Sequence, residues 1–513
     1  MRLRKSVILL VISIFVLALF GCNENVSKSP IISEVNEEDG NYKGRTFYEI
    51  FVRAFNDSNG DGVGDLKGVT DKLDYLEDLG IKGIWLMPIT KSASYHGYDT
   101  VDYYSIQEEY GTIDDLKELI EEANKRDIKV IMDLVLNHTS TEHPWFIDAR
   151  KNIDSEYRDY YIWESDMSKI DEISTMDTKR WTQNGDKEEL YNAIFWGGMP
   201  DLNFDNEKVI EETKKIAKYY LDLGIDGFRL DAVKWIYEDK DKNIEFWNDF
   251  NKYVKSVDED AVLVGEVWDK PAAIFEYAEP LDSFFEFSIG DDIVSAIKNS
   301  TLSYFPQKFN EWNDKYTEVN PDFSIANFLS NHDQSRIMSR LQEEYKAKIA
   351  AALYLTLPGT PYIYYGEELG MMGVKPDERI REPFIWSSTD ESLNTNWIDI
   401  TNDVSKVALD VQIDDPDSMY NTYKDILKVK NENISLRLGK VSSIECGNRK
   451  VLVMERTYED DRTLVILNSS RVDQAITLDK EGYSILYDNQ EYKVGDKLPK
   501  DLTLKSGEIL IVK

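Results

Sequence analysis

Three acidic residues stand at the ends of predicted strands, where their carboxyl groups could act together. Asp231, Glu266 and Asp333 each end or follow a short apolar run that is typical of a buried β-strand. Retaining cleavage of a glycosidic bond needs a carboxylate nucleophile and a proton-donating carboxyl about 5–5.5 Å apart. Arg229, on the same strand face as Asp231, would keep that carboxylate ionised. Glu266 has apolar neighbours that would raise its pKa, as a general acid requires. Each residue alone also fits a structural role, but together they predict retaining glycoside cleavage.

The histidines are concentrated near the same strand ends. The chain has only four. His138 and His332 follow the third and seventh predicted strands, and His96 lies in the loop after the second. These are the positions where a barrel opens to its substrate. His143 is interpreted as a polar loop residue.

The segment 57–65 has the composition of a calcium loop. Oxygen-bearing side chains alternate with glycines that permit a sharp turn, which suits a hard cation. Gly68 stands where an EF-hand has its closing Glu, so that bidentate ligand is missing. A polar turn without metal is the alternative. The predicted Ca²⁺ ligands are Asp57, Asn59, Asp61, the carbonyl of Val63, and Asp65.

Alternating strands and helices must position these residues. From residue 45 onward, short β-branched runs alternate with amphipathic helical stretches such as 66–79, which indicates βα units and a parallel sheet. Gly80 and Gly224 fit the left-handed residue that ends a helix before a strand. The eight strands predict an α/β fold with a (β/α)₈ TIM barrel. They lie in segments 46–52, 81–87, 129–136, 223–231, 261–267, 283–287, 324–329 and 361–365.

Two segments depart from the βα alternation. The connection after the third strand is long and rich in tryptophan, so we interpret it as an inserted domain on the catalytic face. After about residue 432, short strands separated by turns predict a C-terminal antiparallel β-sandwich. The expected boundaries are 42–137 and 204–432 for the barrel, 138–203 for the inserted domain and 433–513 for the β domain.

The first 22 residues have the pattern of an export signal. A basic start precedes an apolar run that ends in Gly21-Cys22, which resembles a lipoprotein cleavage box. A plain signal peptide or an uncleaved anchor is the alternative, because Phe20 is bulky for that box. Residues 23–41 are polar and acidic and predict a flexible tether. We therefore expect an extracellular lipoprotein held to a bacterial membrane by its lipid alone.

The charge balance excludes some classes of partner. The chain has 96 acidic and 60 basic residues and a net charge of −36. Nucleic acids and anionic membrane surfaces would be repelled, whereas a neutral polysaccharide would not. Only Cys446 accompanies Cys22, so no intrachain disulfide is expected once Cys22 is lipidated. We expect a monomer.

Four sequence segments together resemble the signature regions of the α-amylase superfamily of glycoside hydrolases. They occur in the family's order, at the ends of the expected strands. Any one is a weak signal, but the four together are specific, and the resemblance covers the chain from about residue 45 to the C-terminus. The segments are 133–138, 227–231, 265–268 and 328–333.

The resemblance implies a role for each site residue. Asp231 is the implied nucleophile, Glu266 the acid and then the base, and Asp333 the residue that holds the distorted sugar. Starch and maltooligosaccharides are the implied substrates. A second calcium site that includes Asn137 is not predicted, because Trp235 stands where many α-amylases have His. The implied substrate contacts are His96, Tyr98, Asp99, His138, Arg229, Lys234 and His332.

Bond specificity is addressed by two further features. The segment 199–203 resembles the fifth signature region of one α-amylase subgroup, which lies between oligo-1,6-glucosidases and neopullulanases. Ala232 follows the implied nucleophile, where many α-1,6-specific relatives have Val, which favours α-1,4 bonds. We therefore expect an endo-acting α-1,4-glucan hydrolase. A 4-α-glucanotransferase and an exo-acting α-glucosidase stay open, and a non-catalytic glucan-binding protein is the remaining alternative.

Overall fold

A closed barrel of eight parallel strands forms the centre of the protein. The structure is a computed structural model and describes residues 42–513. The strand order is β11-β10-β9-β5-β2-β1-β13-β12, and a parallel bridge between Phe285 and Ala326 joins the two end strands. The predicted (β/α)₈ barrel is confirmed. Its strands are β1 (Phe47–Ile50), β2 (Gly83–Leu86), β5 (Lys129–Leu134), β9 (Gly227–Leu230), β10 (Val262–Gly265), β11 (Ser283–Phe284), β12 (Ala326–Asn327) and β13 (Thr360–Tyr364).

The predicted signal, lipid anchor and tether fall on residues 1–41 and lie outside the described residues. Within 42–513, no helix is both long and apolar enough to span a bilayer.

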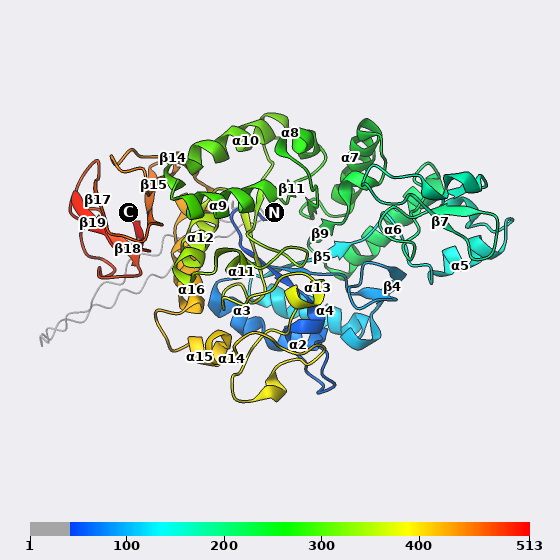
Figure 1. Cartoon of the computed structure of the whole chain (residues 1–513), viewed down its shortest axis with the longest axis horizontal. Helices are drawn as coiled ribbons and strands as arrows, with labels where there is room; N and C mark the ends of the chain where they lie inside the picture. The colour runs from blue at the N-terminus through cyan, green and yellow to red at the C-terminus, as the bar shows by residue number, and fades with distance from the viewer. Residues whose placement is uncertain (1–41) are drawn as a thin grey trace, which may run out of the picture. The chain divides into compact units, whose positions relative to one another are not determined.

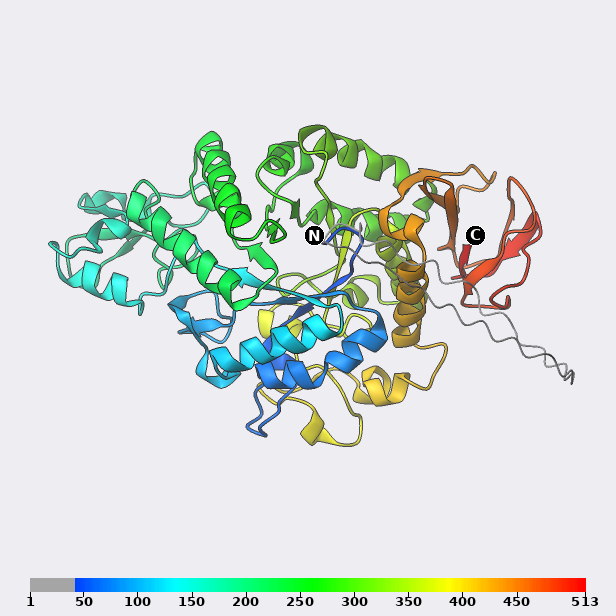
Figure 2. The same ribbon diagram turned by 180° about the vertical axis from the view of Figure 1, so that it is seen from behind.

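Helices surround the barrel (Figures 1 and 2). Helices such as Ile113–Lys125 and Glu207–Leu223 bury one apolar face, whereas Glu344–Thr356 is buried over most of its surface. Gly80 and Gly224 end helices in the left-handed conformation, with φ of 94° and 101°, as predicted. The predicted helix 66–79 is divided in two at Lys72. The main helices are α2 (Leu66–Asp71), α3 (Leu73–Leu79), α4 (Ile113–Lys125), α6 (Glu207–Leu223), α7 (Lys240–Val257), α9 (Phe287–Asn299), α10 (Phe305–Val319), α12 (Glu344–Thr356) and α16 (Met419–Glu432).

The barrel interior is filled mainly by apolar side chains, with polar groups towards one end. Phe47, Trp85, Ile131 and Tyr362 belong to one buried cluster on the inward face of their strands. Because side chains alternate along a strand, the residue two positions after such an inward side chain faces inward as well. This places Glu49 and Asp133 above the apolar layer, at the carboxyl ends of β1 and β5.

The connections at the carboxyl ends of the strands are long and carry their own small elements. Between β5 and α6, helix α5 (Pro144–Lys151) accompanies a three-stranded sheet of order β6-β8-β7. An antiparallel bridge between His138 and Asp201 joins the beginning and the end of this inserted segment. A hairpin after β2 was not predicted. These strands are β3 (Thr90–Ser92), β4 (Thr100–Ile106), β6 (Trp163–Glu164), β7 (Trp181–Gln183) and β8 (Leu190–Asn192).

A further long connection follows β13 and was not predicted. It contacts the candidate calcium loop, where the backbone N–H of Asn396 donates to the carbonyl of Gly62 at 2.8 Å. Its helices are α13 (Asp377–Ile380), α14 (Val404–Val407) and α15 (Leu409–Gln412). The other short helices are α1 (Val52–Phe55), α8 (Pro271–Ile274), α11 (Ile337–Leu341) and α17 (Ile434–Leu438). Single 3₁₀ turns are Glu108–Tyr110, Arg158–Tyr160, Met167–Asp171, Val233–Trp235, Phe275–Ala278, Leu302–Tyr304 and Glu391–Leu393.

The C-terminal part forms two antiparallel sheets, which confirms the predicted β domain. The larger sheet has the order β14-β15-β16-β20-β18, and the smaller pairs β17 with β19. Val453 and Ile466 of the larger sheet share a buried cluster with Ile476 and Leu504 of the smaller one. The strands are β14 (Lys440–Ser443), β15 (Val451–Tyr458), β16 (Asp461–Asn468), β17 (Gln474–Thr477), β18 (Ile485–Asp488), β19 (Asp501–Leu504) and β20 (Ile509–Val512). Figures 1 and 2 show this part and the inserted segment on opposite sides of the barrel.

Candidate active site

One buried guanidinium organises the carboxylates at the barrel mouth. Arg229, at 1% exposure, extends from β9 among carboxylates that come from its own strand end and from the neighbouring strands β5 and β10. Its Nη1 donates to Asp133 Oδ1 and to Asp231 Oδ1, each at 2.6 Å, and its Nη2 lies 2.9 Å from Glu266 Oε2. Asp231 and Glu266 therefore lie side by side on the two terminal nitrogens of one side chain, although the sequence separates them by a whole βα unit.

The environment of Glu266 stabilises the protonated carboxyl more than the environment of an exposed glutamate does. Burial raises the pKa of Glu266, Arg229 opposes the rise, and the charges of Asp231 and Asp333 add to it. Burial also raises the pKa of Asp231, and the hydrogen-bonded guanidinium of Arg229 opposes that rise. The site thus holds closely coupled carboxyl groups of the kind that share protons between acid and base roles.

The backbone after Asp231 adopts a conformation that directs an N–H at Glu266. Ala232 has φ of 51°, in the left-handed region that a non-glycine residue rarely occupies. Its backbone N–H donates to Glu266 Oε2 at 3.1 Å. Local strain of this kind is typical of functional sites, where surrounding contacts maintain it.

Asp333 is held ionised by two cationic neighbours. Oδ2 lies 3.0 Å from Nε2 of His332, and Oδ1 accepts from Nη2 of Arg381 at 3.0 Å. Burial acts to raise the pKa of Asp333, but these cations hold it well below its ordinary value. His332 is itself clamped, because Nδ1 lies 2.6 Å from Glu49 Oε1. Burial alone would lower its pKa, yet Asp333 and Glu49 raise it to about 9.

Aromatic and polar side chains surround a cavity of about 350 Å³ above these carboxylates. Tyr98 lies beneath it, stacked on His332 with ring centroids 5.5 Å apart, and its hydroxyl donates to Asp133. The residues that line the cavity are His96, Tyr98, His138, Phe195, Trp196, Met199, Asp231, Ala232, Glu266, Asp333, Asp377 and Arg381.

Comparison with known proteins decides the family. The profile of the α-amylase catalytic domain family matches residues 49–439. Alpha-amylase 3 of Dictyoglomus thermophilum is 45% identical over 444 residues, which cover 86% of this chain and 87% of that protein. This chain belongs to the α-amylase family of glycoside hydrolases. A 4-alpha-glucanotransferase of Thermotoga neapolitana is 35% identical, over 82% of this chain and 95% of its own length. The crystal structure of an α-amylase from H. orenii has a TM-score of 0.85 at 39% identity, covering 92% of this chain and 99% of that one.

The structure brings most, but not all, of the predicted site residues of this α-amylase-family enzyme to the cavity. Arg229 and His332 lie behind its wall as supports. Asp99 is turned away: its Oδ1 accepts from the Ser92 hydroxyl at 2.7 Å, which stabilises the loop that carries Tyr98. Lys234 is paired with Asp269 through a 2.5 Å contact and does not line the cavity. The roles of Asp99 and Lys234 stay predictions.

Several residues of the site were not predicted from the sequence. Glu49 lies next to the last residue of β1 (Phe47–Ile50), and its position near the end of a predicted strand was the only signal in the sequence. Arg381 comes from the long connection after β13, which has no βα pattern to place it. Trp196 belongs to the inserted segment and is 62% exposed in the cavity. Its sequence context, an aromatic pair before two glycines, offered a signal that we did not use.

The candidate calcium loop of this α-amylase-family protein has its oxygen-bearing side chains close to their own backbone. Asp57 accepts from the N–H groups of Asn59, Gly60 and Gly62 through its two oxygens, and Asp61 Oδ1 accepts from Val63 N at 2.8 Å. Asp65 instead caps α2 and bonds Ser58. Residues 42–513 contain no group of three or more His, Cys, Asp or Glu arranged to bind metal. The oxygen donors fit Ca²⁺ chemically if Asn59 and the Val63 carbonyl complete the set.

The His332 ion pairs give a testable dependence of stability on pH. The folded-state pKa of His332, about 9, exceeds the value near 6.5 expected in the unfolded chain. The stabilisation is therefore complete below pH 6.5 and is lost as pH rises through 9. We expect the wild-type melting temperature to fall between pH 6.5 and 9 more steeply than that of His332→Asn, measured by calorimetry. Parallel curves for the two proteins would contradict a protonated His332.

Proposed function

We propose that this enzyme is an endo-acting, retaining α-1,4-glucan hydrolase of starch and maltooligosaccharides. The observation that supports it most is the Arg229 guanidinium, which holds Asp231 and Glu266 side by side below an open, aromatic-lined cavity. Two relatives that are named α-amylases support the choice of substrate.

Each carboxylate has a separate part in the proposed mechanism. Asp231 attacks the anomeric carbon while Glu266 gives its proton to the departing glycosidic oxygen, so one C–O bond breaks and a glycosyl ester forms. Glu266, now ionised, takes a proton from water, which attacks the same carbon and releases Asp231. Asp333, kept ionised by His332 and Arg381, accepts hydrogen bonds from sugar hydroxyls in the distorted ring.

Transfer to a second sugar is the competing function. It would use the same ester, and the similarity to a 4-alpha-glucanotransferase favours considering it. The test is chromatography of the products from maltoheptaose. Short mixed maltooligosaccharides support endo hydrolysis, products longer than maltoheptaose indicate transfer, and glucose alone indicates an exo-acting α-glucosidase. The same assay on pullulan reports whether α-1,6 bonds are cleaved.

Trp196 is proposed as a sugar-stacking platform in the cavity. A Cβ at Gly198 would lie 2.0 Å from Cζ3 of the indole, so the ring rests directly on that glycine. We expect Trp196→Ala to raise KM for maltoheptaose about tenfold with a smaller change in kcat, because the lost contact is made in both ground and transition states. Gly198→Ala, which must displace the ring, should raise KM in the same direction. Unchanged KM in steady-state assays of both variants would contradict this role.

Calcium binding by the loop 57–65 is also proposed, on the basis of its oxygen donors and glycines. Calcium at 100 times its dissociation constant would stabilise the fold by about 2.7 kcal/mol. We expect EDTA to lower the melting temperature by several degrees and added Ca²⁺ to restore it, whereas Asp57→Ala should melt at the lower temperature with or without EDTA. Equal responses of wild type and variant to EDTA would place any metal elsewhere.

A further inference from the structure

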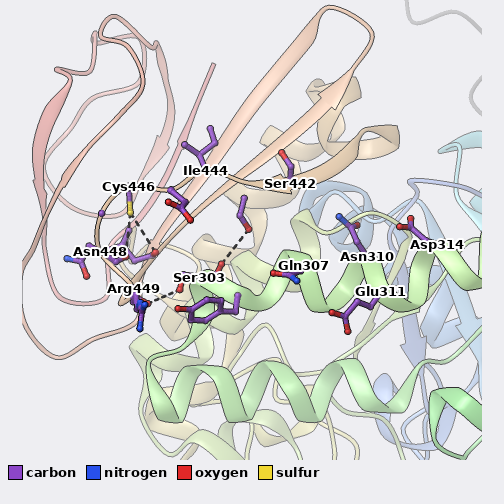
Figure 3. Close-up of a pocket in the computed structure, with 15 residues that line it drawn as sticks. Ser303, Gln307, Asn310, Glu311, Asp314, Ser442, Ile444, Cys446, Asn448 and Arg449 are labelled. Atoms are coloured by element: carbon purple, nitrogen blue, oxygen red, sulfur yellow. Dashed lines mark hydrogen bonds between the residues drawn. The ribbon is translucent and has the colours of Figure 1, made fainter.

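A second cavity, of about 700 Å³, lies between barrel helix α10 and the first strands of the C-terminal domain. It shares no lining residue with the catalytic cavity. Figure 3 shows Gln307, Glu311 and Asp314 along the helix, across from the segment that carries Ile444 and Arg449. We call this cavity the interdomain groove.

The two walls of the interdomain groove are joined by hydrogen bonds. The amide of Asn310 donates to the carbonyl of Val441 at 3.0 Å, and the hydroxyl of Ser303 donates to the carbonyl of Arg449 at 3.0 Å. These contacts connect the start of α10 and the preceding turn to the C-terminal domain. The groove is therefore formed before any ligand binds, which reduces the entropy lost on binding.

The groove presents polar side chains that are available to bind a ligand. Gln307, Glu311 and Asp314 lie four and three positions apart on α10, so they share one face of the helix. Within the described residues, none of these three side chains has a hydrogen-bond or ion-pair partner. One amide and two carboxylates in a row can accept and donate hydrogen bonds to a ligand that runs along the helix.

An aromatic ring stands at the end of this row. Tyr304 lines the groove and is 52% exposed, which is high for a tyrosine in a folded domain. Its ring face is available to the apolar C–H face of a sugar, while the adjacent polar side chains suit the hydroxyls.

The charge of the lining selects the ligand class. Glu311, Asp314 and Glu445 outnumber Arg449, so an anionic ligand would be repelled. We propose that the interdomain groove is a second binding site for a neutral α-glucan chain, which holds the polymer while another part of it enters the catalytic cavity. The identity of the sugar rests on the proposed function, whereas the groove's existence does not.

The test measures binding to insoluble starch separately from catalysis. Tyr304→Ala in the full-length protein is expected to raise the dissociation constant for starch granules about tenfold, because one stacking partner of the sugar is lost. Its kcat/KM on maltotriose, which is too short to span both sites, should stay within twofold of wild type. Tyr304→Phe keeps the ring and should bind starch as wild type does. Tyr104→Ala, which removes a 38% exposed tyrosine outside both cavities, is the matched control.

The outcomes distinguish a failure of the second binding site from a failure of the proposed hydrolase function. Unchanged adsorption of Tyr304→Ala, with a melting temperature equal to that of wild type, overturns the second site. Adsorption reduced equally by Tyr104→Ala also overturns it, because the effect would then be general. A wild-type protein that hydrolyses no α-glucan overturns the proposed function instead. A double variant, Gln307→Ala with Glu311→Ala, should weaken adsorption in the same direction as Tyr304→Ala.

Discussion

Replacing Glu266 with Gln is expected to lower kcat on starch by about 10³-fold, within the range that loss of a general acid–base residue produces. An amide cannot give its proton to the departing glycosidic oxygen, nor can it take one from the attacking water. The substitution keeps the size of the side chain and an oxygen that can accept from Ala232 N, a bond of 3.1 Å in the wild type. The melting temperature should therefore stay within a few degrees of wild type. The measurement is steady-state kinetics together with calorimetry.

A substrate whose leaving group needs no proton provides the control for this role. For a maltoside of an acidic phenol, the first step proceeds without a general acid, so Glu266→Gln should lose far less activity in that step than on starch. A burst of phenol followed by slow turnover would show the glycosyl ester accumulating. Near-normal turnover of starch by Glu266→Gln would contradict the assignment of Glu266 as the acid.

Replacing Arg229 with Leu is expected to lower the free energy of unfolding by about 3–5 kcal/mol, the usual result of removing one partner from a buried ion pair. Three carboxylates, those of Asp133, Asp231 and Glu266, lie within 2.9 Å of this guanidinium. Without it they would repel one another in a site from which water is largely excluded. Urea denaturation followed by circular dichroism measures the effect. Activity should be lost as well, because Asp231 would no longer be held in its ionised form.

The pH dependence of the Arg229→Leu variant distinguishes charge repulsion from a packing defect. Burial already raises the pKa of Asp133 to about 7, and the pKa of Asp231 in the same direction. Without Arg229 these groups would bind protons more tightly in the folded state than in the unfolded chain, so stability would fall as pH rises. The deficit relative to wild type should shrink between pH 8 and pH 5. A deficit that does not vary with pH, or one below 1 kcal/mol, would contradict the electrostatic account.

The sequence alone was sufficient to predict the barrel and the three carboxylates at its mouth. Helix-period and strand-period apolar patterns alternate along most of the chain, and Gly80 and Gly224 mark where helices end, so local physics fixes most element positions. Parallel strands in a barrel bring their carboxyl ends to one face. Asp231, Glu266 and Asp333 could therefore be placed together without knowing any contact between them.

Contacts between distant segments were decided only by the tertiary structure. The bond from Arg381 to Asp333 spans 48 residues and that from His332 to Glu49 spans 283, and no periodicity in the sequence encodes such pairings. The same holds for Trp196 above the carboxylates and for the interdomain groove between α10 and the C-terminal strands. The sequence by itself determined that Asp231, Glu266 and Asp333 meet at the barrel mouth, because strand direction places them. The protonation of Asp333 depends instead on His332, which pairs with Glu49 of the first strand, and on Arg381, which comes from a long irregular connection. Only the folded structure decided these pairings, because they depend on how distant segments pack.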